Sequence, residues 1–286
     1  MIDLSIIIVN YNGEKLLREC LYSVYENTKK LSFEVIMVDN NSTDNSVQLV
    51  SREFPEVKII RSKENLGFSR GNNKGLDIYQ GRYALLLNTD TVVKDRALDK
   101  LVEFMDRNIK AGACGPKLLN QDGTPQHQGG LFNRRFWLAK RPVMVDYVLG
   151  AALLVRREVI DRVGGLDENF FFSNDDLDWC RRIRKAGWQI YFVPDAEVIH
   201  YGGYTTKKFN QKIFVEGFRG GLYFCRKHYG NFVYQIYRLL LVLAMLLALF
   251  FSLLLYPIAD KRRLAAYFQV LLIALKGALL PPYAEK

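Results

Sequence analysis

The chain has 286 residues, 49% of them hydrophobic, and a formal net charge of +10. This length allows one large domain or two small ones, and the positive charge favours an anionic partner such as nucleic acid, anionic lipid or a phosphorylated substrate. The four cysteines are far apart and form no CxxC pair, which argues against a disulfide framework or a structural zinc site and is typical of a reducing cytoplasm. No charged region with a cleavable apolar segment precedes the first apolar run, so no signal peptide is expected.

The first ninety residues alternate between apolar, β-branched runs and amphipathic patterns. The runs predict strands at residues 4–9, 33–38, 57–60 and 83–87. Helices are predicted at residues 14–26, after a cap at Ser42, Thr43 or Asp44, and from residues 65–73. This alternation favours a right-handed, parallel α/β sheet. No GxGxxG follows the first strand and no GxxxxGK[ST] occurs, which disfavours a pyridine-dinucleotide domain and a P-loop enzyme.

The second half continues with shorter elements. Helices are predicted at residues 94–108, 156–162 and 175–186, and strands at residues 111–118, 147–155 with a break at Gly150, and 190–193. Pro194 follows the last strand, and residues 197–200 are expected to return the chain toward the site. Residues 119–146 form a long predicted loop, of the kind that serves as a lid or an acceptor contact. Residues 209–228 are aromatic and basic at helical spacing.

The C-terminal region contains residues 239–258, twenty positions without a charge, which is long enough for a helix to cross a bilayer. A second apolar segment, residues 264–280, either returns across the bilayer or lies in its interface. The basic run 261–263 between them speaks against a simple outward-facing loop. We therefore expect three parts: a catalytic domain (1–205), an amphipathic connecting helix (206–238) and a membrane anchor (239–286) with one or two passes.

Polar residues stand where three of the predicted strands end. They are Asn10, Asp39 and Asp90. Ligands of open α/β sheets bind beyond the carboxyl ends of the strands, so these three side chains should line one crevice. Three polar strand ends on one edge favour a nucleotide site over simple helix capping.

A second candidate site is the acidic run Asn174-Asp175-Asp176-Leu177-Asp178. Three carboxylates this close repel one another, so at least one should have a raised pKa. The helix N-terminus alone can account for Asp178, whereas Asp175 and Asp176 follow an aromatic run and are candidate general bases. His200 and Asp90 would make a mixed nitrogen and oxygen site for Mg²⁺ or Mn²⁺. Such a site neutralises a leaving nucleoside diphosphate while a base deprotonates an attacking hydroxyl.

Five motifs, in this order, resemble glycosyltransferase family 2. They are SIIIVNYN (5–12), VDNNSTD (38–44), NLGF (65–68), LNTD (87–90) and GGLDE (164–168). The resemblance runs from about residue 3 to about residue 205 and is strongest to the bacterial rhamnosyltransferase-like branch. It implies the GT-A fold, a Rossmann-like and mostly parallel sheet flanked by helices, here with a C-terminal membrane-associated helical segment. It also implies an inverting, single-displacement mechanism.

The resemblance also assigns roles. Asp39 would accept the N3–H of uracil or thymine, Asp90 would be the remaining acid of the DxD motif, His200 a late metal ligand and Asp176 the catalytic base. Asn88 replaces the first acid of DxD, and Asp175 replaces the usual Glu, so the choice between Asp175 and Asp176 stays open, with the family favouring Asp176. The expected nucleotide-sugar contacts are Asn10, Asn12, Asp39, Ser42, Asn65, Gly67, Phe68, Asn72, Asn88 and Asp90.

The expected donor is a UDP- or dTDP-sugar, with L-rhamnose one candidate sugar, and the expected acceptor is a polyprenyl-diphosphate-linked saccharide of the cell envelope. The enzyme would sit at the bacterial inner membrane with its catalytic domain in the cytoplasm. Seven basic residues near the apolar segment suit this acceptor or simply attract anionic lipids. They are Lys207, Lys208, Lys212, Arg219, Arg226, Lys227 and Arg238.

Two rival functions stay open: a polyprenyl-phosphate monosaccharide synthase, and a non-catalytic sugar-nucleotide sensor, which Asn88 would suit. Nucleic-acid binding ranks low, because the basic residues gather near the apolar segment. The sequence leaves open the sugar, the acceptor and the oligomeric state.

Overall fold

The computed structural model describes residues 2–128, 135–202, 210–254 and 260–277. It divides into two compact units. The first, here called the sheet unit, comprises Met1–Leu166 and Asp176–Tyr204. The second, here called the helical unit, comprises Asp167–Asp175 and Thr205–Lys286. The segment between two helices of the sheet unit thus belongs to the helical unit.

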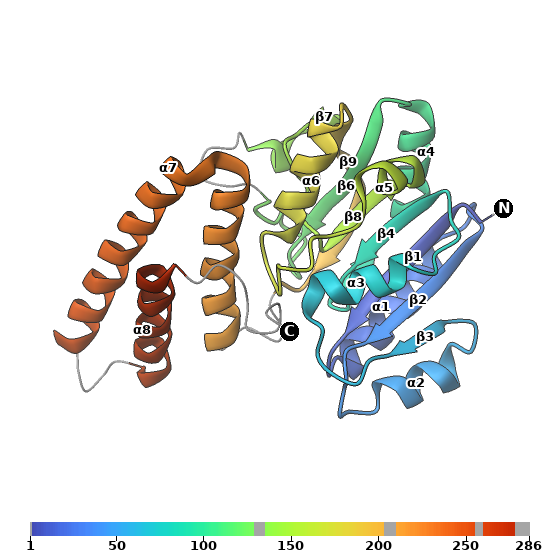
Figure 1. The fold of residues 1–286 in the computed structure, drawn as a ribbon. Coiled ribbons are helices and arrows are strands. Elements are labelled where there is room, and N and C mark those ends of the chain that lie inside the picture. Colours follow the sequence, from blue (N-terminus) through green and yellow to red (C-terminus); the bar gives the residue numbers. More distant parts are fainter. Residues whose placement is uncertain (1, 129–134, 203–209, 255–259, 278–286) are drawn as a thin grey trace. The chain divides into compact units, whose positions relative to one another are not determined.

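The sheet unit is built on a nine-stranded sheet of the described residues, in the order β3-β2-β1-β4-β8-β6-β9-β5, with β7 paired to β9 (Figure 1). The strands are β1 (Leu4–Asn10), β2 (Phe33–Asp39), β3 (Lys58–Arg61), β4 (Tyr83–Leu87), β5 (Thr91–Val93), β6 (Ala111–Leu119), β7 (Val143–Met144), β8 (Ala152–Arg156) and β9 (Gln189–His200). The first four strands are parallel, as predicted. Strand β8 runs antiparallel to β4 and β6, and β5 antiparallel to β9. The sheet is therefore mixed and mostly parallel, as the predicted fold class requires.

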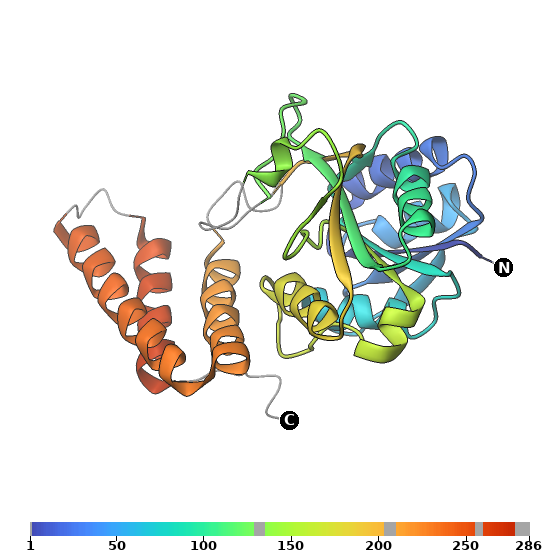
Figure 2. The ribbon, with the colours of Figure 1, turned by 90° about the horizontal axis from the view of Figure 1, so that it is seen from above.

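Helices cover both faces of this sheet (Figure 2). One face carries α1 (Glu14–Asn27), α2 (Ser46–Glu53) and α4 (Ala97–Arg107), and the other carries α3 (Gly67–Leu76), α5 (Arg157–Val163) and α6 (Asp175–Lys185). Central strand β1 serves both layers, because Ile6 and Ile8 belong to the first core and Ile7 to the second. A strand buried on both faces explains the unbroken apolar run in the sequence.

The predicted strand at residues 147–155 is mostly wrong, since only β8 forms. The backbone before it bonds to α6 instead: the Gly150 N–H donates to the Asp176 carboxylate, and the Val148 carbonyl lies 3.9 Å from the Cys180 Sγ. The predicted strand at 190–193 is longer than expected, since β9 continues through Pro194 to His200. Its register with β6 shifts between Val193 and Glu197, and Pro194 is tolerated at this bulge.

The predicted loop at 119–146 contains a short 3-10 helix, η1 (Phe136–Leu138), and strand β7. Residues 129–134 of that prediction lie outside the described part of the chain. The predicted cap of α2 is wrong by one residue, because Asn45 occupies the N-cap position. The predicted Asp44 still accepts the backbone N–H of Ser46, the first residue of α2, through its Oδ1.

The helical unit contains α7 (Gln211–Leu254) and α8 (Lys261–Lys276). Helix α7 breaks at Gly230, with φ 78° and ψ −178°, a conformation that glycine adopts without strain. Its first segment runs to Gly230 and its second segment follows. Both segments pack against α8 in one apolar core, to which α7 gives Val215, Leu222, Tyr234 and Leu241 and α8 gives Ala266, Val270 and Ala274.

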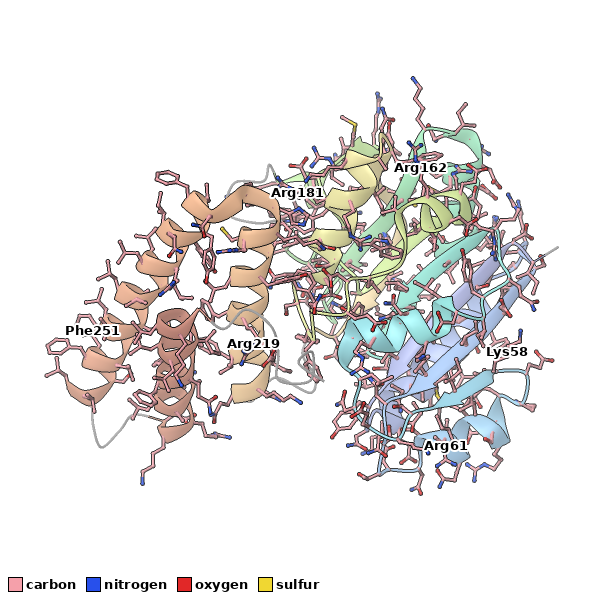
Figure 3. All side chains as sticks on the ribbon, viewed as in Figure 1. Lys58, Arg61, Arg162, Arg181, Arg219 and Phe251 are labelled. Atoms are coloured by element: carbon pink, nitrogen blue, oxygen red, sulfur yellow. The ribbon has the colours of Figure 1, made fainter. Side chains whose placement is uncertain are left out.

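The second segment of α7 exposes many large apolar side chains. They include Phe232, Leu239, Leu240, Leu243, Leu247, Phe250 and Phe251. Phe251 points outward from α7 in Figure 3. Among the described helices, α7 alone is long and apolar enough to cross a membrane, and most of its apolar stretch is not buried. Residues 255–258 and 278–280 of the predicted apolar segments, and Lys207 and Lys208, lie outside the described residues.

Candidate active site

The predicted nucleotide residues at the ends of β1 and β2 come together. Asn10 and Asp39 are register partners, and both are buried. The Asn10 Nδ2 lies 3.4 Å from the Asp39 Oδ1 and 3.1 Å from the Ser42 Oγ. The backbone N–H of Ser42 donates to the Asp39 Oδ2 at 3.2 Å. Asn12 closes this loop, since its backbone N–H donates to the Ser42 Oγ at 3.0 Å.

The start of α3 is tied to the same edge. The Asn40 Nδ2 donates to the Gly67 carbonyl at 2.9 Å, and the Gly67 N–H donates to the Asn65 Oδ1 at 2.9 Å. Gly67 has φ 76°, which favours glycine at this turn. Asn72 differs from the others: it is 1% exposed and its Nδ2 donates to the Phe68 carbonyl within α3. The amide nitrogen of Asn72 therefore makes a hydrogen bond within α3.

The predicted metal residues also meet. Pairing of Thr91 with His200 across β5 and β9 places the His200 Nε2 3.4 Å from the Asp90 Oδ1 and 3.5 Å from the Asn88 Nδ2. The Tyr201 N–H donates to the Asp90 carbonyl at 2.9 Å and fixes the backbone there.

Gln126 orients His200, and the sequence reasoning missed it. The Gln126 Nε2 donates to the His200 carbonyl at 3.2 Å, so the amide presents its Oε1 to the His200 Nδ1, 2.9 Å away. An amide oxygen can only accept, so Nδ1 donates its hydrogen to it, and in the neutral ring Nε2 is the nitrogen with the lone pair. A glutamine inside a long predicted loop gave no signal of this contact.

Asp90, His200 and Asn88 fit a divalent cation that also binds a nucleotide. In the described part of the chain, no group of three or more His, Cys, Asp and Glu side chains could hold a metal by itself. Mg²⁺ takes few protein ligands and fills its other positions with water and phosphate oxygens. One carboxylate, one imidazole with a free lone pair and one amide suit that partial set.

The Asp176 carboxylate is held at the start of α6. Its Oδ2 accepts the Gly150 N–H at 3.0 Å and its Oδ1 accepts the Leu177 N–H at 2.8 Å. Burial raises the pKa of Asp176 above its usual value, although these hydrogen bonds act to lower it. A carboxyl with a raised pKa and a fixed position meets the requirements of a general base.

The segment Gly150-Ala151 joins the two ends of the site. Gly150 donates to Asp176, and the next residue, Ala151, accepts the Asn88 N–H at 3.0 Å. A Cβ at Gly150 would lie 3.1 Å from the Phe68 Cζ and 3.6 Å from the Asp176 Cβ, so Phe68 also lies against this segment. The structure thus brings Asn88, Phe68 and the candidate base to one backbone segment.

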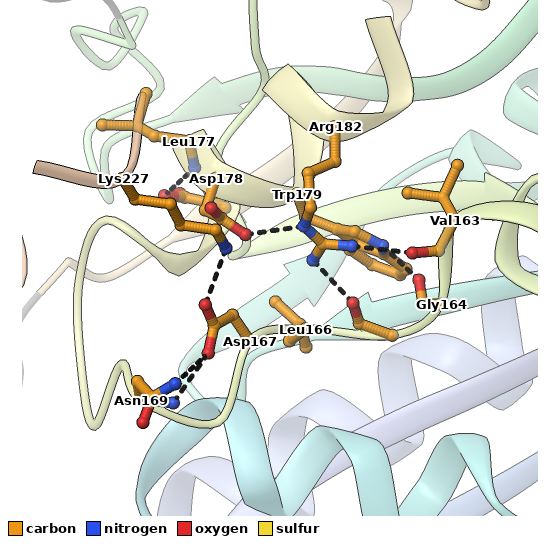
Figure 4. Close-up of polar contacts among 12 residues, drawn as sticks. Val163, Gly164, Leu166, Asp167, Asn169, Leu177, Asp178, Trp179, Arg182 and Lys227 are labelled. Carbon is orange, nitrogen blue, oxygen red and sulfur yellow. Dashed lines mark hydrogen bonds and ion pairs between the residues drawn. The ribbon is translucent and has the colours of Figure 1, made fainter. Parts of the chain in front are cut away.

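The other two acids of the run differ from Asp176. Asp178 is fully buried and accepts from the Arg182 Nε at 2.7 Å, as Figure 4 shows. Arg182 also donates to the carbonyls of Val163 and Gly165. Asp178 therefore fastens α6 to the turn after α5, which goes beyond the expected role at a helix start. Asp175 is buried and is the first residue of α6.

The helical unit holds the segment that leads into α6. The Asp167 Oδ2 accepts from the Lys227 Nζ at 2.6 Å (Figure 4). It also accepts from the Tyr223 hydroxyl at 2.9 Å. Although burial acts to raise the pKa of Asp167, its bonds to Lys227, Asn169 and Tyr223 hold it below the usual value. At the other end of the segment, Asn174 donates to the Gly217 carbonyl of α7 at 3.0 Å.

A family model shows which group of proteins this chain belongs to. Residues 5–164 match the family model described as "Glycosyl transferase family 2", and the chain belongs to that family. It has the GT-A fold and falls in the rhamnosyltransferase-like branch, as predicted.

Three relatives are proteins of glycan synthesis. The N-acetylglucosaminyl-diphospho-decaprenol L-rhamnosyltransferase of Mycobacterium tuberculosis (strain H37Rv) is 27% identical over 240 residues, which cover 71% of this chain and 77% of that protein. The low-salt glycan biosynthesis hexosyltransferase Agl10 of Haloferax volcanii is 29% identical, with 69% of this chain and 67% of that protein covered. The dTDP-rhamnosyl transferase RfbF of Shigella flexneri is 24% identical, with 71% and 70% covered.

Two solved structures share the fold. The mannosyltransferase PcManGT of Pyrobaculum calidifontis, in complex with GDP-Man and Mn²⁺, has a TM-score of 0.62 at 17% identity and covers 98% of this chain and 89% of its own. GalNAc-T7, with UDP, GalNAc and Mn²⁺, has a TM-score of 0.61 at 18% identity, and this chain spans 50% of its length. At these identities the likeness concerns the fold alone.

Proposed function

We propose that the protein is an inverting glycosyltransferase that moves a sugar from a pyrimidine nucleoside-diphosphate sugar to a polyprenyl-diphosphate-linked saccharide in cell-envelope synthesis. The observation that carries the proposal is the joint attachment of Asp176 and Asn88 to the consecutive residues Gly150 and Ala151. Under this proposal the candidate base and the candidate leaving-group site would adjoin the same backbone segment, and a single displacement would need them on opposite faces of the anomeric carbon.

Asp39 would read the donor base. Its carboxylate can accept the N3–H of uracil or thymine, whereas the N1 of adenine is itself an acceptor. The neighbouring Asn10 Oδ1 is buried and has no hydrogen-bond partner among the described residues, so a donor of the ligand could also reach it. Guanine carries an N1–H and is therefore the competing base in any test.

Asp176 would act on the acceptor. Its carboxylate takes the proton of the attacking hydroxyl while that oxygen bonds to the anomeric carbon. The bond from the anomeric carbon to the diphosphate oxygen breaks on the opposite face, and the nucleoside diphosphate leaves with the electron pair. Configuration at the anomeric carbon is thereby inverted. The raised pKa of Asp176 favours this proton uptake.

Asp90 and His200, with Asn88 beside them, would hold Mg²⁺ or Mn²⁺. When bound, the cation neutralises negative charge on the diphosphate as it leaves. The Gln126 carbonyl oxygen accepts the Nδ1 hydrogen of His200, so in the neutral ring Nε2 would be the nitrogen available to the cation.

The acceptor proposal rests on relatives and on α7. One relative is named for a decaprenol-linked N-acetylglucosamine acceptor and L-rhamnose, and another for dTDP-rhamnose. Helix α7 exposes enough apolar surface to anchor the chain at the inner membrane, where such lipids reside. We propose L-rhamnose as the first sugar to test and a cytoplasmic position for the sheet unit.

The test is transfer by the full chain in an uncharged detergent. Labelled dTDP-rhamnose, UDP-N-acetylglucosamine and GDP-mannose are each offered with polyprenyl-diphosphate-N-acetylglucosamine or with bare polyprenyl phosphate, with Mn²⁺ or with a chelator. The proposal predicts label in the lipid extract only with the saccharide-bearing acceptor and a pyrimidine donor. Transfer to bare polyprenyl phosphate would instead identify a monosaccharide synthase. Donor binding with neither transfer nor hydrolysis would identify a sensor.

A further inference from the structure

The helical unit contains a groove of about 630 Å³ between the first segment of α7 and α8. Apolar side chains line part of it: Val215, Leu272 and Ile273. Cationic side chains line another part: Lys212, Arg219 and Lys276. A groove with both kinds of wall suits a ligand with an anionic head and an apolar tail.

The charge of the groove is positive. Among the described residues that line it, Glu216 is the only acid, and it pairs with Arg219 at 3.3 Å between the Nε and the Oε1. Both side chains are mostly buried, so the carboxylate holds the guanidinium in place. Three cations and one acid leave a formal charge of 3 − 1 = +2. Each phosphate of a diphosphate diester carries a negative charge, so this ligand matches the groove in charge. Lys and Arg are the usual partners of phosphate oxygens.

The apolar wall narrows the choice of ligand. Inorganic diphosphate gains nothing from Leu272 or Val215. An ordinary phospholipid headgroup brings one phosphate. Helix α8 also exposes Phe268 and Leu275, 53% and 52% exposed, which offers further apolar surface to a chain that leaves the groove. A diphosphate that carries an isoprenoid chain uses both walls.

The turns of α7 that line the groove also hold the segment before the candidate base. The Lys212 Nζ lies 4.1 Å from the centroid of the Phe171 ring, and the Gly217 carbonyl accepts from Asn174 at 3.0 Å. A Cβ at Gly220 would lie 3.0 Å from the Asn174 Nδ2 and 3.2 Å from the Ser173 carbonyl oxygen, so a larger residue there would push against this segment. Residues 171–174 run directly into Asp175 and Asp176. Ligand in the groove would therefore contact the helix that positions this segment.

We infer that the groove between α7 and α8 binds the diphosphate and the adjoining isoprene units of the acceptor lipid, an inference that rests on the proposed function. Lys212, Arg219 and Lys276 bind the phosphates, and Val215, Leu272 and Ile273 contact the chain. Here the basic residues of the first segment of α7 form a defined site, in addition to any general attraction to the membrane.

The binding test uses the full chain in an uncharged detergent and a labelled short-chain polyprenyl diphosphate as the probe. Lys276→Gln and Arg219→Gln should each weaken binding about 10-fold or more, because each removes a charge-assisted contact. Leu272→Trp, which fills the groove, should weaken it similarly. Lys261→Gln is the matched control, since it removes a cation from α8 outside the groove. Competition by inorganic diphosphate or by anionic phospholipid at equal concentration would overturn the assignment, as would equal loss with Lys261→Gln.

The kinetic test separates this inference from the proposed function. Lys276→Gln and Leu272→Trp should raise the KM for the lipid acceptor about 10-fold and leave the KM for the donor unchanged. If transfer occurs and both variants keep the wild-type acceptor KM, the groove assignment is wrong and the function stands. If the probe binds as described but no sugar is transferred from any donor, the proposed function is wrong and the lipid site stands.

Discussion

The backbone N–H of Gly150 donates to the Asp176 Oδ2 at 3.0 Å, and this bond fixes the carboxylate that we propose as the base. Residues 147–150 do not join the sheet, although their apolar pattern predicts a strand, and the Gly150 N–H bonds to Asp176 instead of to a neighbouring strand. A stretch whose pattern predicts a strand therefore holds a partly buried carboxylate at the start of α6.

The pH profile should show the raised pKa of Asp176. A general base must be ionised, so kcat/KM should rise with pH through a limb that lies above the ordinary Asp value of about 4. Stability should change in the opposite direction: a pKa raised by burial means that the folded state favours the neutral carboxyl, so this stabilisation is lost as pH rises through the folded pKa. Rates and melting temperatures between pH 4 and 8 check both. An acid limb at or below pH 4 contradicts the assignment.

His200→Ala should raise the Mn²⁺ concentration needed for half-maximal activity, because Asp90 and the diphosphate remain as ligands. Gln126→Leu should raise it about 10- to 100-fold, since the imidazole loses the acceptor that fixes its tautomer. Gln126→Glu keeps an acceptor for the His200 Nδ1 hydrogen and should recover most of that loss. A metal titration of initial rates checks the series. The same metal requirement in Gln126→Leu and wild type would show that Gln126 does not position His200.

Asp39→Ala should weaken binding of UDP and dTDP by removing the partner of the pyrimidine N3–H. A charged hydrogen bond of this kind contributes about 1.5–3 kcal/mol, which is roughly 10- to 100-fold in Kd. Calorimetry of wild type and variant with UDP, dTDP, GDP and ADP measures the change. If the wild-type protein binds ADP as tightly as UDP, the assignment of Asp39 is wrong. A preference for GDP would show that Asp39 recognises guanine.

Lys227→Met should destabilise the helical unit and reduce transfer while donor binding survives. It leaves the Asp167 carboxylate, 14% exposed, without its cation, a loss of about 1–3 kcal/mol. Lys74→Met is the control, because it removes an exposed pair at 3.6 Å. Because the folded pKa of Asp167 is lowered, its contribution is present above the ordinary Asp pKa of about 4 and is lost as pH falls through the folded value. Thermal unfolding of both variants at pH 7 and pH 3 tests this: equal losses from Lys74→Met and Lys227→Met would contradict it.

The sequence predicted the elements whose pattern is local. Strand β4 was predicted with its observed bounds, and the meeting of Asn10 and Asp39 followed from parallel strand order. Contacts between distant segments were missed, because no pattern near Gln126 indicates its hydrogen bond to His200, which is 74 positions away. The role of Asp178 was missed for the same reason, since its partner Arg182 also binds the turn at Gly165.

The helical break at Gly230 was also missed. The apolar count locates residues 239–258, but the end of one helical segment depends on the left-handed φ of one glycine and on the packing of Tyr234 and Leu241 against α8. The sequence shows a glycine at position 230 but does not show which backbone conformation it adopts.

The identity of the base is the central claim, and paired substitutions test it most directly. Asp176→Asn keeps the side-chain shape, so donor and Mn²⁺ binding should persist while the single-turnover transfer rate falls about 10²- to 10⁴-fold. Asp175→Asn, at the preceding residue, should have the milder effect. Single-turnover transfer with prebound donor and saturating acceptor measures both rates. If Asp175→Asn abolishes transfer while Asp176→Asn stays near the wild-type rate, the base is Asp175 and the account of Gly150 and Asp176 is wrong.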